Sequence, residues 1–179
     1  MKIAFYLGTF DPFHNGHLKV VETAFERDKM DKVVIVPTMQ SPWKFNKTLD
    51  LFNRNTIIAL SVAEDYYNKR YNIVTDFIEK DLSAPYYSYI TLDHLKEKYG
   101  KGNELYFLCG EDTMNDIPNW KNGDKILAEW KFLVVPRPEG SISSSEIRKL
   151  VKECKDISPY VDKKVVKIIT RYYFYDPEP

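Results

Sequence analysis

The sequence has few cysteines, no excess of charge of either sign and no apolar run long enough to cross a membrane. The two cysteines, Cys109 and Cys154, have the spacing of neither a disulfide framework nor a metal site, so we expect reduced thiols and a cytoplasmic protein. The 26 basic and 26 acidic side chains cancel, which excludes the bulk positive field of non-specific nucleic-acid binders. The apolar run at the N-terminus ends at Asp11 and Pro12, too early for a signal peptide. We therefore expect neither a nucleic-acid nor a membrane partner.

The chain of 179 residues is long enough for one α/β domain, spanning residues 1–179, with a core that needs no metal or disulfide. Short β-branched and aromatic runs predict buried strands at residues 2–7, 32–36, 71–74, 105–109 and 131–135. Helical spacing lies between them at residues 16–29, 51–67, 88–99 and 111–129. This alternation predicts a Rossmann-like parallel sheet with helices on both faces.

Ligands of such sheets bind beyond the carboxyl ends of the strands. The predicted strands place Gly8, Pro37, Gly110 and Pro136 along this rim. The polar segment of residues 38–50 lacks periodicity and predicts a mobile loop over the same rim.

The segment from Gly8 to His17 has the composition of a phosphate-binding turn. A glycine at the end of the first strand lets the backbone approach a ligand closely. The helix that starts near Asn15 points its free N–H groups at the turn, and His14 and His17 fall on one side of its first turn. Taken singly, these histidines are equally compatible with surface groups or half of a metal site. The whole string matches GxFDPxHxGH, the signature of the nucleotidyltransferase superfamily, and so resembles a site for a nucleoside triphosphate.

A second candidate anion site lies in residues 142–148. Ser143 and Glu146 form a capping box at the start of a helix. This cluster has a purely structural alternative, in which the serines only cap the helix. Arg148, one turn into the helix, favours a site for the β- and γ-phosphates, and Arg137 adds another charge nearby.

Residues 143–179 are expected to form a C-terminal helical part that carries this second phosphate motif. A helix over residues 159–172 shows an apolar packing face and an outward, solvated row of lysines. The aromatic residues 172–175 are expected to anchor the end of the chain by packing.

With both segments, the chain resembles the nicotinate mononucleotide adenylyltransferases of NAD biosynthesis over nearly its whole length. Residues 36–44 are similar to that family's loop with proline and lysine. Residues 87–92 are similar to its YTxxTL element, and residues 109–120 to its GxDxxxxxxxW element. Two departures stand out: Ser145 replaces a usual threonine, and the stretch between Arg137 and Ile142 is short.

The resemblance implies specific roles for residues outside the two phosphate motifs. Trp120 would stack on the pyridine ring, although a tryptophan packed in the core is the alternative. Ser88 and the N–H of Tyr89, at the start of a helix, would receive the nicotinate carboxylate. Asp112 would bind ribose hydroxyls, unless it only caps its helix. Lys44 would approach the phosphate of the mononucleotide, unless it is only solvated.

We expect the protein to transfer the adenylyl group of ATP to nicotinate mononucleotide, with release of pyrophosphate. Mg²⁺ would be bound through the triphosphate, without a dedicated set of protein ligands. The expected catalytic residues are His14, His17 and Arg148; those expected at ATP are Gly8, Thr9, Phe10, Gly16, Gly110, Asp112, Arg137, Ser143, Ser144 and Ser145.

Three alternatives stay open. Residues 137–143 also resemble the RTxGIS segment of cytidylyltransferases. Phosphopantetheine adenylyltransferases share the GTFDP and NGH strings but resemble TxGH where this chain has HxGH. A nucleotide-binding sensor without chemistry is the third. The sequence leaves the oligomeric state open, a homo-oligomer included.

Overall fold

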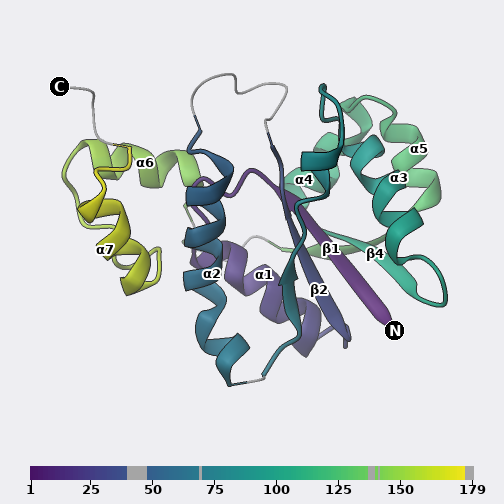
Figure 1. Ribbon diagram of the computed structural model, residues 1–179, viewed down its shortest axis with the longest axis horizontal. Helices are drawn as coiled ribbons and strands as arrows, with labels where there is room; N and C mark the ends of the chain where they lie inside the picture. The colour runs from purple at the N-terminus through teal and green to yellow at the C-terminus, as the bar shows by residue number, and fades with distance from the viewer. Residues whose placement is uncertain (40–47, 69, 137–139, 141, 176–179) are drawn as a thin grey trace.

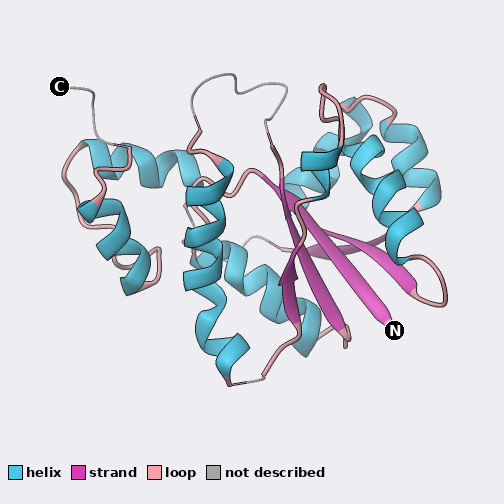
Figure 2. Ribbon diagram, in the orientation of Figure 1, coloured by secondary structure: helices cyan, strands magenta, loops and turns pink. Residues whose placement is uncertain are grey.

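Five parallel strands form the centre of the structure, a computed structural model that describes residues 1–39, 48–68, 70–136, 140 and 142–175. The strands are β1 (Lys2–Gly8), β2 (Lys32–Pro37), β3 (Ile73–Thr75), β4 (Glu104–Gly110) and β5 (Lys131–Val135). They run in the order β3-β2-β1-β4-β5, all parallel (Figure 2). From β1 the chain passes to β2 on one side of β1, and after β3 it returns to the opposite side of β1 as β4. This reversal of strand order opens a crevice at the carboxyl ends of β1 and β4.

Helices cover both faces of the sheet, as the sequence predicts (Figure 1). One face packs on α1 (Asn15–Glu26) and α2 (Leu51–Tyr67), and the C-terminal helices α6 (Ser144–Lys152) and α7 (Lys163–Arg171) lie beyond α2, with α7 packed against it, and extend the same hydrophobic cluster. The other packs on α3 (Ser88–Tyr99) and α5 (Gly123–Glu129). A hydrophobic core lies on each face of the sheet, and the side chains of β1 alternate between them. Ala4 and Tyr6 pack into the core on the first face, and Ile3 and Phe5 into the core on the second. Burial on both sides explains why the strands read as continuous apolar runs.

The carboxyl ends of the strands meet at one rim, which confirms the sequence prediction. Gly8 pairs with Pro37, and Gly110 pairs with Val135, the residue before Pro136. The loop predicted over this rim lies largely outside the described residues.

The segment of residues 111–129 is largely helical, as predicted, but it is not one continuous helix. The segment forms α4 (Glu111–Asp116), a 3₁₀ turn η2 (Ile117–Asn119) and then α5. Pro118 lacks the N–H that a continuous helix needs, and Asn122 is left-handed with φ of 53°. A Cβ at Gly123 would collide with the carbonyl of Ile117, so the glycine permits this tight break.

The remaining differences from the sequence prediction are small. The third strand lies at Ile73–Thr75, and a 3₁₀ turn η1 (Ile78–Asp81) follows it. The last helix begins at Lys163, where the carboxylate of Asp162 accepts a hydrogen bond from the N–H of Lys164 at 2.7 Å. The aromatic tail is an anchor only in part, because Tyr172 and Tyr173 are exposed whereas Phe174 and Tyr175 pack on the core.

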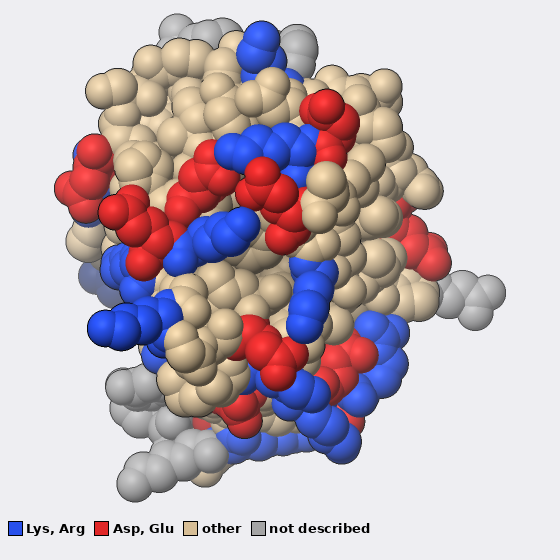
Figure 3. Space-filling view, turned by 90° about the vertical axis from the view of Figure 1, so that its right-hand side faces the viewer, with Lys and Arg blue, Asp and Glu red and all other residues tan. Residues whose placement is uncertain are grey.

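Charged side chains of both signs are interspersed on the face shown in Figure 3. Ion pairs join α3 to α5, with 2.7 Å between Lys125 and Asp93 and 3.2 Å between Lys96 and Glu129. Neither sign dominates this face. No helix in the described part of the chain is both long and apolar enough to span a membrane.

Candidate active site

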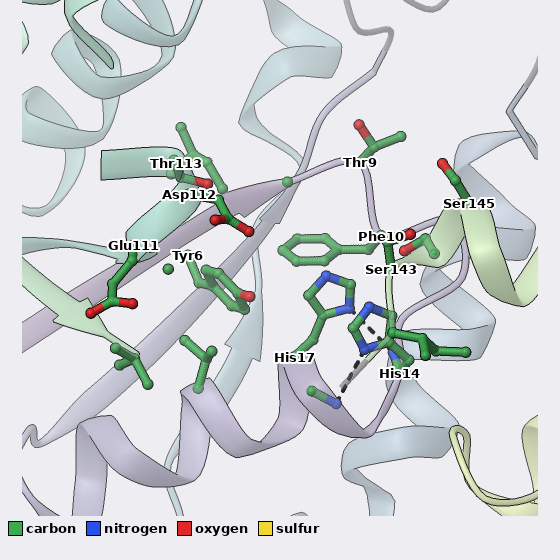
Figure 4. Close-up of a pocket in the computed structure, with 18 of the residues that line it drawn as sticks. Tyr6, Thr9, Phe10, His14, His17, Glu111, Asp112, Thr113, Ser143 and Ser145 are labelled. Carbon is green, nitrogen blue, oxygen red and sulfur yellow. Dashed lines mark hydrogen bonds between the residues drawn. The ribbon is translucent and has the colours of Figure 1, made fainter. Parts of the chain in front are cut away.

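A cleft of about 480 Å³ opens at the rim of the sheet, between the ends of β1, β4 and β5 and the start of α6 (Figure 4). It collects eleven of the residues predicted to bind or act on ATP: Gly8, Thr9, Phe10, His14, Gly16, His17, Gly110, Asp112, Ser143, Ser144 and Ser145. Residues from positions 8 to 145 thus meet in one place. Glu111 and Thr113 line it as well, and sequence reasoning had not singled them out.

The turn after β1 is shaped by Gly8 and Phe10. The backbone of Phe10 adopts a left-handed conformation, with φ of 51°, and its ring folds back over Gly8. A Cβ at Gly8 would lie only 2.8 Å from carbons of that ring. The glycine is therefore required for packing within the turn, in addition to any approach of a ligand.

His14 and His17 together cap the N-terminus of α1. The Nδ1 atom of His14 accepts a hydrogen bond from the N–H of Gly16 at 3.1 Å, and the Nδ1 of His17 accepts one from the N–H of His14 at 3.2 Å. A ring nitrogen that accepts carries no proton, so the proton of each neutral ring lies on Nε2. The rings stack with 3.7 Å between centroids and project into the cleft (Figure 4). Local capping thus fixes two adjacent N–H donors.

The ring of His17 is surrounded by aromatic side chains. Its centroid lies 5.1 Å from that of Phe10, 5.2 Å from that of Phe13 and 6.1 Å from that of Tyr6. Burial lowers the pKa of His17 well below its ordinary value, and the neighbouring His14 lowers it further. His17 is therefore neutral at physiological pH and presents a hydrogen-bond donor without a permanent charge.

The serine cluster forms the predicted capping box. The hydroxyl of Ser143 accepts from the N–H of Glu146 at 3.2 Å, and the carboxylate of Glu146 accepts from the N–H of Ser143 at 2.6 Å. Ser144 donates its hydroxyl to the carbonyl of Pro12 at 3.0 Å, which docks α6 against the β1–α1 turn. The free N–H groups of this helix start accordingly join those of α1 at one cleft.

Arg148 lies beside the cleft but is not among the residues that line it. Its guanidinium donates to the carbonyl of Asp11 and, at 3.0 Å, to the hydroxyl of Ser145. In this structure it joins α6 to the β1–α1 turn, and its predicted contact with the phosphates stays a prediction.

Of the residues predicted to bind the mononucleotide, Asp112 lines this cleft, whereas Ser88, Tyr89 and Trp120 do not. Ser88 and Tyr89 are the first two residues of α3, where backbone N–H groups have no acceptor within the helix. The indole N–H of Trp120 donates to Asp116 at 2.9 Å, and its ring lies 6.4 Å from that of Phe107. Lys44 and Arg137 fall outside the described residues, so the structure does not test their roles.

Comparison with known proteins places this site in a family. The family model described as cytidylyltransferase-like matches residues 5–159. A probable nicotinate-nucleotide adenylyltransferase of Fusobacterium nucleatum is 32% identical over 97% of this chain and 99% of its own length. Another, of Flavobacterium johnsoniae, is 34% identical over 98% of this chain and 99% of its own length. The chain belongs to the nicotinate-nucleotide adenylyltransferase family.

The fold of this adenylyltransferase family is found in solved structures as well. The nicotinic acid mononucleotide adenylyltransferase of Plasmodium falciparum, solved in complex with NaAD, superposes with a TM-score of 0.79 at 21% identity, covering 97% of each chain. The Rossmann-like architecture predicted from the sequence is confirmed.

Sequence reasoning missed the buried polar groups that pack behind the β1–α1 turn. Arg54, from α2, is 1% exposed and donates to the carbonyls of Thr9, Met39 and Leu49 at 2.8 to 3.1 Å. Asp11 is 2% exposed and accepts from the hydroxyl of Tyr175. The GxFDPxHxGH motif includes Asp11 and could have identified it, but no local sequence pattern distinguishes Arg54 or Tyr175 from other residues of their type.

Proposed function

We propose that this nucleotidyltransferase transfers the adenylyl group of ATP to nicotinate mononucleotide, giving nicotinate adenine dinucleotide and pyrophosphate. The observation that carries the proposal is the stacked pair of His14 and His17, whose donors are fixed at the start of α1 within the cleft. The family relationship supports the choice of substrates.

In the proposed reaction, an oxygen of the mononucleotide 5′-phosphate attacks the α-phosphorus of ATP in line. The bond from that phosphorus to the bridging oxygen breaks, and pyrophosphate leaves with the electron pair. Because the attacking phosphate is already anionic near neutral pH, the reaction needs neither a protein nucleophile nor a strong base. Catalysis then consists of positioning and charge stabilisation.

The phosphates would bind between the two helix starts. The Nε2–H groups of His14 and His17 would hold the α- and β-phosphates as charge builds on the bridging oxygen. Arg148 and the turn of residues 143–145 would hold the rest of the triphosphate, which requires the Arg148 guanidinium to reach past Ser145. Gly8, Thr9, Phe10, Gly16 and Gly110 would contact the nucleotide through the backbone rim of the cleft.

The two nucleosides would be recognised at the start of α4 and of α3. Asp112, which lines the cleft, would bind ribose hydroxyls. The N-terminus of α3, with Ser88 and Tyr89, would receive the nicotinate carboxylate, because a helix start favours an anion. Trp120 would offer its ring to the pyridine, and we retain Lys44 and Arg137 as phosphate-binding candidates.

Mg²⁺ is expected to enter with the triphosphate. The hard carboxylate oxygens of Glu111 and Asp112 line the cleft and suit such an ion, directly or through water. In the described part of the chain no three His, Cys, Asp or Glu side chains gather into a metal site. When bound, the ion would neutralise charge on the phosphate oxygens. A cytoplasmic site of action fits the two free cysteines.

The deciding experiment is a matrix of pyrophosphate release. ATP or CTP is combined with nicotinate mononucleotide, nicotinamide mononucleotide, phosphopantetheine or glycerol phosphate. We expect ATP with nicotinate mononucleotide to be fastest. A preference for CTP would overturn the assignment of the base, and equal rates with both pyridine mononucleotides would overturn the role of Ser88. Tight ATP binding without turnover would indicate a sensor.

A further inference from the structure

The carboxylate of Asp11 lies buried behind the phosphate turn, and no step above uses it. Its Oδ1 accepts hydrogen bonds from the hydroxyl of Tyr175 at 2.8 Å and from the N–H of Leu49 at 3.3 Å. Its Oδ2 has no hydrogen-bond partner among the described residues, and a guanidinium nitrogen of Arg148 is 3.9 Å away. A buried carboxylate is costly unless partners compensate for lost hydration, so each of these contacts matters to the turn.

Three backbone carbonyls of the same turn accept hydrogen bonds from side chains of two helices. The carbonyl of Thr9 accepts from Arg54, that of Asp11 from Arg148, and that of Pro12 from Ser144. These donors come from α2 and α6. The geometry of the turn is therefore coupled to the side chain of Asp11, which lies at its centre and three residues before His14.

Tyr175 reaches this turn from 164 residues further along the chain. It follows α7, packs against the core of α1 and α2, and adopts a left-handed backbone with φ of 69°. That conformation is uncommon for a tyrosine. Burial and the charge of Asp11 raise the pKa of Tyr175, so its hydroxyl stays a donor at neutral pH.

We propose that Tyr175 is a positioning residue for nucleotidyl transfer: by donating to Asp11, it holds the turn of residues 9–13, and with it Arg148, in the arrangement that the triphosphate requires. The proposal rests on the proposed function for its substrates. Tyr175 does not line the cleft, so it acts only through Asp11. Tyr175, 164 residues from Asp11 in the sequence, thereby becomes part of the phosphate site.

The test removes one hydroxyl, with Tyr175→Phe. Among the described residues, the Asp11 carboxylate then keeps only the longer hydrogen bond from Leu49, and its charge draws Arg148 away from the phosphates. We expect kcat/KM for ATP to fall about 10-fold, the scale of one hydrogen bond to a charged group. The KM for nicotinate mononucleotide should not change, because α3 lies apart from this network.

A change in the pH profile would separate positioning from a general structural effect. Burial raises the pKa of Asp11, while the bond from Tyr175 and the charges of Arg148 and Arg54 lower it. Loss of the hydroxyl raises this pKa further. Since a protonated Asp11 no longer attracts Arg148, the loss of kcat/KM for ATP in Tyr175→Phe should be largest where Asp11 is ionised and should shrink as the pH falls through this raised pKa.

The matched control is Tyr173→Phe, the same change at a side chain that is 75% exposed; it should leave both kinetics and pH profile unchanged. A second test introduces Tyr175→Phe into an Asp11→Asn background, where the effect should shrink to less than about 2-fold because the charge is gone. An unchanged kcat/KM for ATP, an equal loss for both substrates, or an undiminished effect in the Asp11→Asn background would overturn the proposal.

The experiment also distinguishes the two proposals. If the wild-type protein does not turn over ATP with nicotinate mononucleotide, the proposed function fails. The role of Tyr175 is then read from calorimetric binding of a non-hydrolysable ATP analogue. Tyr175→Phe should weaken that binding about 10-fold, and unchanged binding would refute the role of Tyr175 alone.

Discussion

Replacing His17 by alanine tests the pair of fixed imidazole donors most directly. The substitution removes the Nδ1 that accepts from the N–H of His14, and the Nε2–H that would bind phosphate. Loss of the cap costs about 1 kcal/mol, and loss of the ring from its contacts with Phe10 and Phe13 adds a similar amount. The unfolding free energy should therefore fall by about 2 kcal/mol, which leaves the protein folded.

The effect on turnover should be far larger than the effect on stability. Removing one preorganised donor from a developing oxyanion lowers kcat by about 10²- to 10³-fold. The assay is pyrophosphate release with ATP and nicotinate mononucleotide at saturation, so that weaker ground-state binding does not contribute. Thermal unfolding in parallel measures how much of the variant is folded.

His94 provides the control. It lies on α3 with its side chain 46% exposed, and its ring nitrogen is 4.0 Å from the carboxylate of Glu97. His94→Ala should keep kcat and stability close to wild type. A kcat for His17→Ala within about threefold of wild type, in folded protein, would refute the assignment of His17 as a phosphate donor.

The remaining predictions concern stability. The wild-type unfolding free energy should decrease as the pH drops below about 6.5. The reason is that the pKa of His17 is lower in the folded protein than in the unfolded chain, so the unfolded chain binds the proton more readily. Denaturant titrations over this pH range should show a smaller decrease for His17→Ala than for the wild type. Gly8→Ala should lower stability by about 1–3 kcal/mol through the clash with Phe10, whereas Gly110→Ala, whose Cβ would meet nothing closer than 3.9 Å, should be nearly neutral in thermal unfolding. Arg54→Met should destabilise the fold by about 3–5 kcal/mol in chemical denaturation, since three backbone carbonyls lose their donor; a loss below 1 kcal/mol would contradict the role given to this buried guanidinium.

The features that sequence reasoning predicted correctly are those that depend on residues close together in the sequence. Alternating strands and helices follow from local periodicity. The capping box of Ser143 and Glu146, and the two histidines on the first turn of α1, depend on spacings of three residues. The break at Pro118 was equally local, but it was missed because the apolar pattern on either side continues through it.

The amino-acid sequence by itself determined the class of fold, the position of the rim and the two helix starts that we propose as donors to phosphate, because short-range sterics and hydrogen bonds decide all three. Only the tertiary structure decided which distant side chains hydrogen-bond to the β1–α1 turn and hold it in place. The bonds from Tyr175 to Asp11, from Arg148 to the turn and from Arg54 to three carbonyls join residues between 5 and 164 positions apart. Most of these partners come together only when helices dock on the sheet, because burial then makes each unpaired polar group costly and selects the partner within reach.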